Sequence, residues 1–126
     1  MPVTYRIDQS ERLIHTRCVG PVVLAEVRQH FIDLSQDPAC SERLDVLLDL
    51  TAMTTLPASD QLRTVTGDIA RLRPQIQFGF CAVIASAPAL FGMSRMFEVF
   101  AEQYFTSVAV FRTEAEGVHW LEAQQR

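Results

Sequence analysis

Short apolar runs alternate with amphipathic segments along most of this chain, and the alternation limits the folds that it can adopt. Residues 44–50 (LDVLLDL) and 76–85 (IQFGFCAVIA) are almost continuously apolar, which is typical of strands that are covered on both faces. Between and after these runs, apolar residues recur at spacings of three and four, as in a helix with one buried face. Strands that alternate with helices form a mostly parallel sheet through right-handed crossovers.

The first twenty residues predict a hairpin instead. Residues 3–7 alternate between apolar and polar, a polar turn follows at 8–11, and a second strand-like run covers 13–19, so the two strands are expected to pair antiparallel. The whole pattern predicts an α/β fold with a mixed, mostly parallel five-stranded sheet and four helices in the order ββαβαβαβα. The predicted strands are 3–7, 13–19, 44–50, 76–85 and 108–111, and the helices are opened by Gly20-Pro21, Pro57, Pro88 and Thr113.

Length and charge restrict the function further. A chain of 126 residues has room for one core, so residues 1–126 are expected to form a single domain. The net charge is −4, and the eleven basic residues, all Arg, are spread along the chain. Without a basic stripe we expect no nucleic-acid partner. No apolar run approaches the ~20 residues of a membrane span, so we expect no membrane insertion and a cytoplasmic location.

Motifs that carry catalysis are absent from the sequence. It contains no G-x-S-x-G, no Walker-type G-x-x-x-x-G-K and no G-x-G-x-x-G pattern. The histidines His15, His30 and His119 fall on three different predicted elements, and none has a second ligand at metal-site spacing. We therefore expect no catalytic residues, no metal and no cofactor. Binding is a better hypothesis than catalysis.

The segment Asp49–Asp60 (DLTAMTTLPASD) is one candidate binding site. It leaves the carboxyl end of a predicted central strand and enters a helix, the edge at which open α/β sheets place their ligands. The alternative is ordinary helix capping, with Thr54 or Thr55 as the cap and Pro57 in the first turn. The candidate ligand-binding residues at this edge of the sheet are Asp49, Thr51, Thr54, Thr55, Ser86 and Arg95.

The predicted third helix carries more apolar surface than one buried face requires. Leu90, Met93, Phe97, Phe100 and Tyr104 form the expected core stripe. Further large apolar residues lie outside that stripe, so neighbouring elements, a second subunit or an apolar ligand must cover them. These interface candidates are Phe91, Met96, Val99 and Phe105.

The order of elements resembles the SpoIIAA-like family, whose STAS-type fold includes anti-sigma-factor antagonists. The resemblance is strongest in VLLDLTAMTTLPASD and in the C-terminal half, where CAVIA and FGMSRMFEVF precede VAVFRTEAEGVHWLE. The latter pattern is similar to an uncharacterised bacterial branch that is sometimes linked to CRAL-TRIO-like lipid-binding domains. The resemblance implies a regulatory phospho-acceptor at Ser59. The flanking residues depart from the family's D-S-S-G turn, because Pro57 and Asp60 stand where that turn has Asp and Gly.

Two functions follow from these observations. The first is a non-catalytic binding or regulatory module that mediates protein–protein interaction and self-associates, as a homodimer or larger homo-oligomer, through the third helix. The alternative is a carrier or sensor of a lipid or other apolar small molecule held between the third helix and the sheet. That pocket would be lined by Phe91, Met96 and either Phe78 or Phe80, with Arg95 facing an acidic head group.

Overall fold

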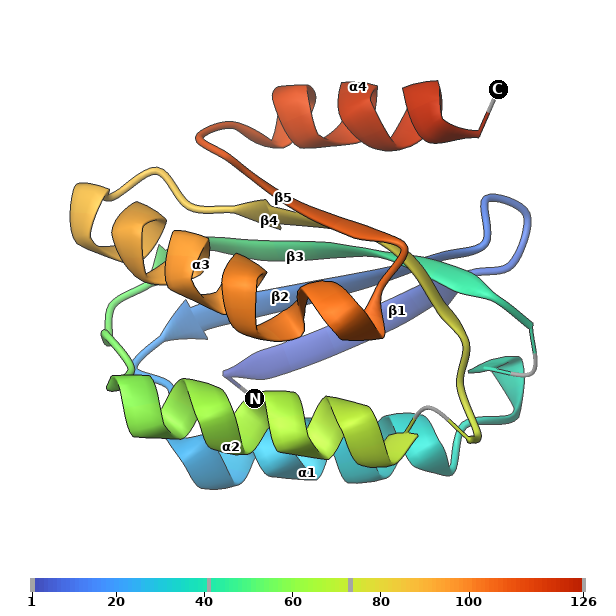
Figure 1. Ribbon diagram of the computed structural model, residues 1–126, viewed down its shortest axis with the longest axis horizontal. Coiled ribbons are helices and arrows are strands. Elements are labelled where there is room, and N and C mark those ends of the chain that lie inside the picture. Colours follow the sequence, from blue (N-terminus) through green and yellow to red (C-terminus); the bar gives the residue numbers. More distant parts are fainter. Residues whose placement is uncertain (1, 41, 73, 126) are drawn as a thin grey trace.

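The computed structural model describes residues 2–40, 42–72 and 74–125, and it contains a five-stranded sheet with helices on both faces (Figure 1). The strands are β1 (Val3–Asp8), β2 (Leu13–Gly20), β3 (Leu44–Met53), β4 (Phe78–Ile84) and β5 (Ser107–Phe111). The helices are α1 (Leu24–Ser35), α2 (Ser59–Leu72), α3 (Pro88–Ala101) and α4 (Glu114–Gln124), with short 3₁₀ turns at Pro38–Cys40 and Glu102–Tyr104.

The strand order in the sheet is β1-β2-β3-β4-β5, with β1 antiparallel to β2 and all other neighbours parallel. This confirms the predicted mixed sheet and the predicted order of elements. Because each crossover from β2 to β5 connects adjacent parallel strands with the same hand, α1, α2 and α3 lie on one face of the sheet, which we call the front face. The last helix, α4, covers the opposite, back face (Figure 1).

Several boundaries differ from the sequence predictions. Neither Pro21 nor Pro57 lies in a helix, because α1 begins at Leu24 and α2 at Ser59. The strands before them run further than predicted, since Gly20 still pairs with Met53. Glu26 caps α1 by accepting a hydrogen bond from the Val23 N–H at 2.9 Å. The predicted cap of the second helix by Thr54 or Thr55 is wrong, because α2 begins only at Ser59 and the Thr55 hydroxyl bonds to the backbone of Val22 instead.

The end of the third helix also differs from the sequence prediction. The third helix, whose predicted apolar positions extend to Phe105, is shorter than predicted, because α3 ends at Ala101 and the chain turns through a 3₁₀ segment before Phe105. The predicted start of the last helix is confirmed. Thr113 Oγ1 accepts a hydrogen bond from the Glu116 N–H at 3.3 Å, as in a capping box.

The back layer is closely packed. Leu121 of α4 lies against Leu47, Ala82 and Ile84 on the back face, and all four side chains are buried. At Gly117 the helix approaches the sheet so closely that an added Cβ would lie 2.3 Å from Ile84 Cδ1. Glycine at this position therefore sets the distance between α4 and β4.

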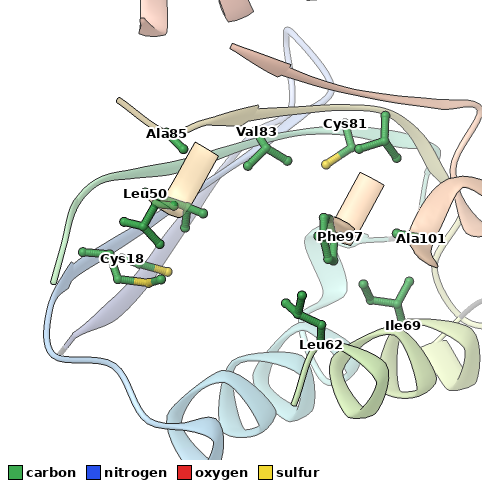
Figure 2. Close-up of a cluster of buried hydrophobic side chains, with 12 residues drawn as sticks. Cys18, Leu50, Leu62, Ile69, Cys81, Val83, Ala85, Phe97 and Ala101 are labelled. Atoms are coloured by element: carbon green, nitrogen blue, oxygen red, sulfur yellow. The ribbon is translucent and has the colours of Figure 1, made fainter. Parts of the chain in front are cut away.

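The front layer is arranged differently. The extensive contacts of α2 are with α1 and α3 rather than with the sheet. Asp68 of α2 ties the helices together, because it accepts hydrogen bonds from Arg28 of α1 at 3.1 and 3.3 Å and also pairs with Arg71. Figure 2 shows side chains of the sheet, such as Val83 and Cys81, pointing toward Leu62 and Ile69 of α2 across the interior.

Among the described residues, no helix has the length and apolar character needed to cross a membrane.

Candidate ligand-binding cavity

A cavity of about 370 Å³ lies between the front face of the sheet and helices α1, α2 and α3. We call it the interior cavity. Its floor follows from strand periodicity, because every second side chain of a strand points to the same face. The floor residues on the three central strands are Ile14, Thr16, Cys18, Val46, Leu48, Leu50, Cys81 and Val83.

The roof of the interior cavity comes from helix periodicity. The apolar stripes predicted for the first two helices face the sheet, and residues three or four apart meet on one side. In α3 the buried positions that line the cavity are Ser94 and Phe97, with Met93 beside them. The apolar roof residues of α1 and α2 are Leu24, Val27, Phe31, Leu34, Leu62, Val65 and Ile69.

The cavity reaches the surface at the carboxyl ends of β2 and β3. Among its lining residues, Val23 and Leu56 are 57% and 58% exposed. They lie on the loops that lead into α1 and α2. Thr55 joins these loops, because its hydroxyl accepts from the Val22 N–H at 3.1 Å and donates to the Val22 carbonyl at 3.0 Å. The mouth is therefore at the edge where open α/β sheets bind ligands.

Two polar side chains of the lining have atoms without a hydrogen-bond partner in the part of the chain that the structure describes. They are Nδ1 of His30 in α1 and Oγ of Ser94 in α3, and both atoms are buried. The other ring nitrogen of His30 lies 3.5 Å from Thr16 Oγ1. Buried polar groups in native proteins are nearly always paired. Both atoms are themselves enclosed, so pairing with a ligand requires a small movement of the side chains around them.

His30 is held in its neutral form by its surroundings. Burial lowers the pKa of the imidazole from 6.5 to about 4, and this outweighs the nearby Asp33 carboxylate, which acts in the opposite direction. The ring packs edge-on against Tyr5 and is tilted against Phe31, with centroids 5.2 and 5.4 Å apart. At neutral pH the imidazole therefore offers one donor and one acceptor and carries no charge.

The cysteines of the lining are not nucleophiles. Cys18 and Cys81 are 5% and 1% exposed, and burial raises the pKa of the Cys18 thiol to about 11. A thiol that stays protonated behaves as a small apolar side chain. Both free thiols are therefore part of the apolar core.

The residues predicted for the ligand edge are dispersed in the structure. Thr55 lines the interior cavity and Thr54 is exposed beside it. Asp49 lies on the back face, where it accepts two hydrogen bonds from Thr51, at 2.9 Å from the backbone N–H and at 2.7 Å from the hydroxyl. Ser86 is exposed before α3. Arg95 lies on the outer side of α3 and pairs with Glu98 at 3.5 Å.

The extra apolar residues of the third helix are covered unequally. The Arg112 guanidinium lies 4.2 Å from the centre of the Phe91 ring, and Phe105 packs against Phe78 with centroids 5.2 Å apart. Met96 and Val99 are 42% and 68% exposed. Of the aromatic residues predicted to line a pocket, Phe78 lines the interior cavity, whereas Phe80 packs on the back layer against Trp120.

Ser59, the candidate phospho-acceptor, is the first residue of α2 and is exposed. The N–H of the preceding residue, Ala58, already donates to the side chain of Gln61 at 2.9 Å. Asp60 follows in the first turn. Ser59 does not line the interior cavity.

A second polar cluster lies on the back face and includes Asp49, one of the residues predicted for the ligand edge. Ligand atoms of His15, Asp49 and Glu114 lie within 4.8 Å of one another. Arg6 donates to His15 Nδ1 at 2.9 Å, so the Nε2 proton faces Glu114 at 3.4 Å. Arg17 lies 3.8 Å from Asp49. Arg17 thus pairs with Asp49, while Arg6 and Glu114 bind the two nitrogens of His15, so each of the three groups has a partner within the protein.

Comparison with known proteins gives the fold. No protein-family model matches this sequence, and no curated protein shows significant similarity to it. The chain is similar to the crystal structure of an uncharacterised protein of the DUF3478 family, with a SpoIIAA-like fold, from Shewanella loihica PV-4. The TM-score is 0.60 at 15% identity, and the match covers 94% of this chain and 91% of that chain. The chain therefore has a SpoIIAA-like fold, as the resemblance in its sequence indicated.

Proposed function

We propose that this protein binds an apolar small molecule in the interior cavity, and that it does so without catalysing a reaction. The observation that carries the proposal is the size of the cavity together with its lining. Protein interiors are packed as closely as organic crystals and contain few voids larger than a water molecule. A cavity of about 370 Å³ in a domain of 126 residues falls in the size range of ligand pockets, roughly 300–1,000 Å³.

The chemistry of the cavity supports binding. Its walls are apolar apart from a few hydroxyl, amide and imidazole groups, and an apolar ligand that replaces water there gains favourable free energy from buried surface. The thiols that line it are protonated, and within the described residues His30 has no carboxylate or serine partner that would make it a general base. Binding therefore accounts for the lining better than acid–base or nucleophilic chemistry does.

The test is a titration with the neutral fluorescent probe N-phenyl-1-naphthylamine. We expect saturable binding of one probe per chain, with increased fluorescence. Val65→Phe places a larger side chain in the cavity from the roof, and we expect it to weaken probe binding at least about tenfold, or about 1.4 kcal/mol. Val99→Phe is the matched control, because it makes the same substitution on the exposed side of α3.

Circular dichroism establishes that both variants fold. Equal probe affinity in the two variants would contradict binding in the interior cavity. Native mass spectrometry of protein purified from its natural host provides a second measurement, in which a co-purifying small molecule released on unfolding supports the proposal.

Self-association through the outer side of α3 is the second candidate function. Its basis is the exposure of Met96 and Val99, one helical turn apart. The other two apolar residues predicted to lie at an interface, Phe91 and Phe105, are covered by Arg112 and Phe78. Only a small apolar area therefore remains exposed on α3. Sedimentation velocity of wild type and Val99→Glu tests it: a dimer that the substitution dissociates supports the interface, and a monomer in both cases removes it.

A further inference from the structure

We propose that the interior cavity selects uncharged apolar molecules that carry one hydrogen-bonding group, such as a hydroxyl or a carbonyl, which pairs with Ser94 or His30. This inference rests on the proposed binding function and specifies its ligand class.

The lining of the cavity contains no charged side chain among the described residues. An ionised carboxylate or ammonium group is costly to bury unless an opposite charge or several hydrogen bonds compensate it. Asp68 of α2 pairs with Arg28 of α1 and with Arg71 of its own helix, and none of these three residues lines the cavity. A charged ligand would thus find no counter-ion inside.

Ser94 is unusual for its position. Its side chain is 0% exposed, on the apolar side of α3 that also carries Leu90, Phe97 and Ala101. A serine within a helix commonly donates to the carbonyl four residues earlier, but this hydroxyl has no partner among the described residues. A hydroxyl can both donate and accept, so Ser94 suits a ligand hydroxyl or carbonyl equally.

His30 is the second lining residue with an unpartnered polar atom, and it lies on α1 rather than on α3. Nδ1 is unpartnered while Nε2 lies near Thr16 Oγ1. The lowered pKa of His30, about 4, keeps the ring neutral at physiological pH. The imidazole therefore offers a hydrogen bond to the ligand and does not act as a counter-ion for a carboxylate.

The volume indicates the size of the ligand. An engineered apolar cavity of about 150 Å³ binds benzene. The interior cavity, at about 370 Å³, is more than twice as large. A bicyclic ring with one substituent is consequently a suitable probe.

The experiment compares 2-naphthol, naphthalene and 2-naphthoate, which share one ring system and differ in the polar group, as competitors of N-phenyl-1-naphthylamine at pH 7.5. We expect 2-naphthol to bind roughly five- to tenfold more tightly than naphthalene, the effect of one net hydrogen bond. We expect 2-naphthoate to bind roughly a hundredfold more weakly than 2-naphthol, because its carboxylate finds no counter-ion.

Ser94→Ala should reduce the ratio of naphthol to naphthalene affinity toward one, and His30→Leu should reduce it as well if His30 shares the contact. Ser86→Ala makes the same change as Ser94→Ala at an exposed position before α3 and should leave the ratio unchanged. The ratio compares two ligands on one variant, so a general loss of stability does not alter it.

The outcomes separate the two proposals. Probe binding with equal affinities for 2-naphthol and naphthalene, or with 2-naphthoate as the tightest competitor, would overturn the selection for neutral polar ligands and leave cavity binding intact. An unchanged ratio in both Ser94→Ala and His30→Leu would overturn the assignment of the contact. Absence of binding by the probe and by all three competitors would overturn both proposals.

Discussion

The two faces of the sheet are packed in opposite ways. On the back face, α4 lies so close to β4 that Gly117 leaves no space for a side chain. On the front face, three helices enclose a cavity of about 370 Å³, and two of the residues that line it, His30 and Ser94, have an unpartnered polar atom among the described residues. The same strands serve both layers, since Ala82 faces α4 and Val83 faces the cavity. The back layer is closely packed, whereas the front layer combines the buried cluster around Leu62, Cys81 and Val83 with the cavity in which we propose that a ligand binds.

Acidification should give the largest change in the free energy of unfolding, and it should act through His30 in the front layer. The pKa of His30 in the folded protein is about 4, below its ordinary value of 6.5, so the unfolded chain binds the proton more readily. The contribution of His30 to the free energy of unfolding is therefore fully present above about pH 6.5. It is lost as the pH is lowered through 4, by about 3 kcal/mol in total. Urea unfolding at pH 7, 5.5 and 4.5 measures this loss.

The variant His30→Gln isolates the contribution of this residue, because it removes the titrating group. Its stability should fall less than that of wild type over the same pH range. His119→Gln, at an exposed position of α4, is the control and should follow the wild-type profile. If the free energies of unfolding of wild type and His30→Gln fell equally with pH, the expected loss of stability through protonation of His30 would be contradicted.

The close packing of the back layer is tested by adding one methyl group. Gly117→Ala gains about 1 kcal/mol of helix propensity but places a Cβ against Ile84, and overpacking of a core costs about 1–3 kcal/mol. We expect a net loss of about 1–2 kcal/mol in urea unfolding. Gly92→Ala is the matched control in α3, where an added Cβ meets nothing within 4 Å, so this variant should become more stable by about 0.5–1 kcal/mol.

The smallest expected effect comes from filling the cavity. Val46→Ile adds one methylene group on the front face, where this partly buried side chain lines the interior cavity, and we expect a change in stability between zero and a gain of about 0.8 kcal/mol. Ala82→Val, on the back face of the neighbouring strand β4, should be destabilising because it meets closely packed side chains. Equal losses in both variants would mean that the two faces are packed alike.

Much of the fold could be predicted from the sequence. The near-continuous apolar character of residues 44–50 and 76–85 indicated central strands, and both are confirmed as β3 and β4. Helix starts were harder to predict. Proline is favoured in a first helical turn, but Pro21 and Pro57 lie in the two loops that Thr55 and Val22 join. Because the two residues are more than thirty positions apart in the sequence, the residues around neither of them indicate that contact.

The candidate site could be predicted only in outline. The edge at the carboxyl ends of the strands was identified, and an apolar ligand was one of two hypotheses, but the pocket was placed around Phe91 and Arg95. Phe91 is instead covered by Arg112 from beyond β5. Ser94 and His30 were not recognised as site residues. Both occupy positions on apolar helical stripes, and a polar residue in such a stripe was the signal that could have identified them.

Whether the front layer really encloses an open apolar space is tested most directly by diffraction from crystals under xenon pressure, since xenon occupies apolar cavities. The account predicts xenon density between α2 and the sheet, beside Val46 and Val65, and none beneath α4 near Gly117. An absence of xenon on the front face, or equal occupancy on both faces, would contradict it.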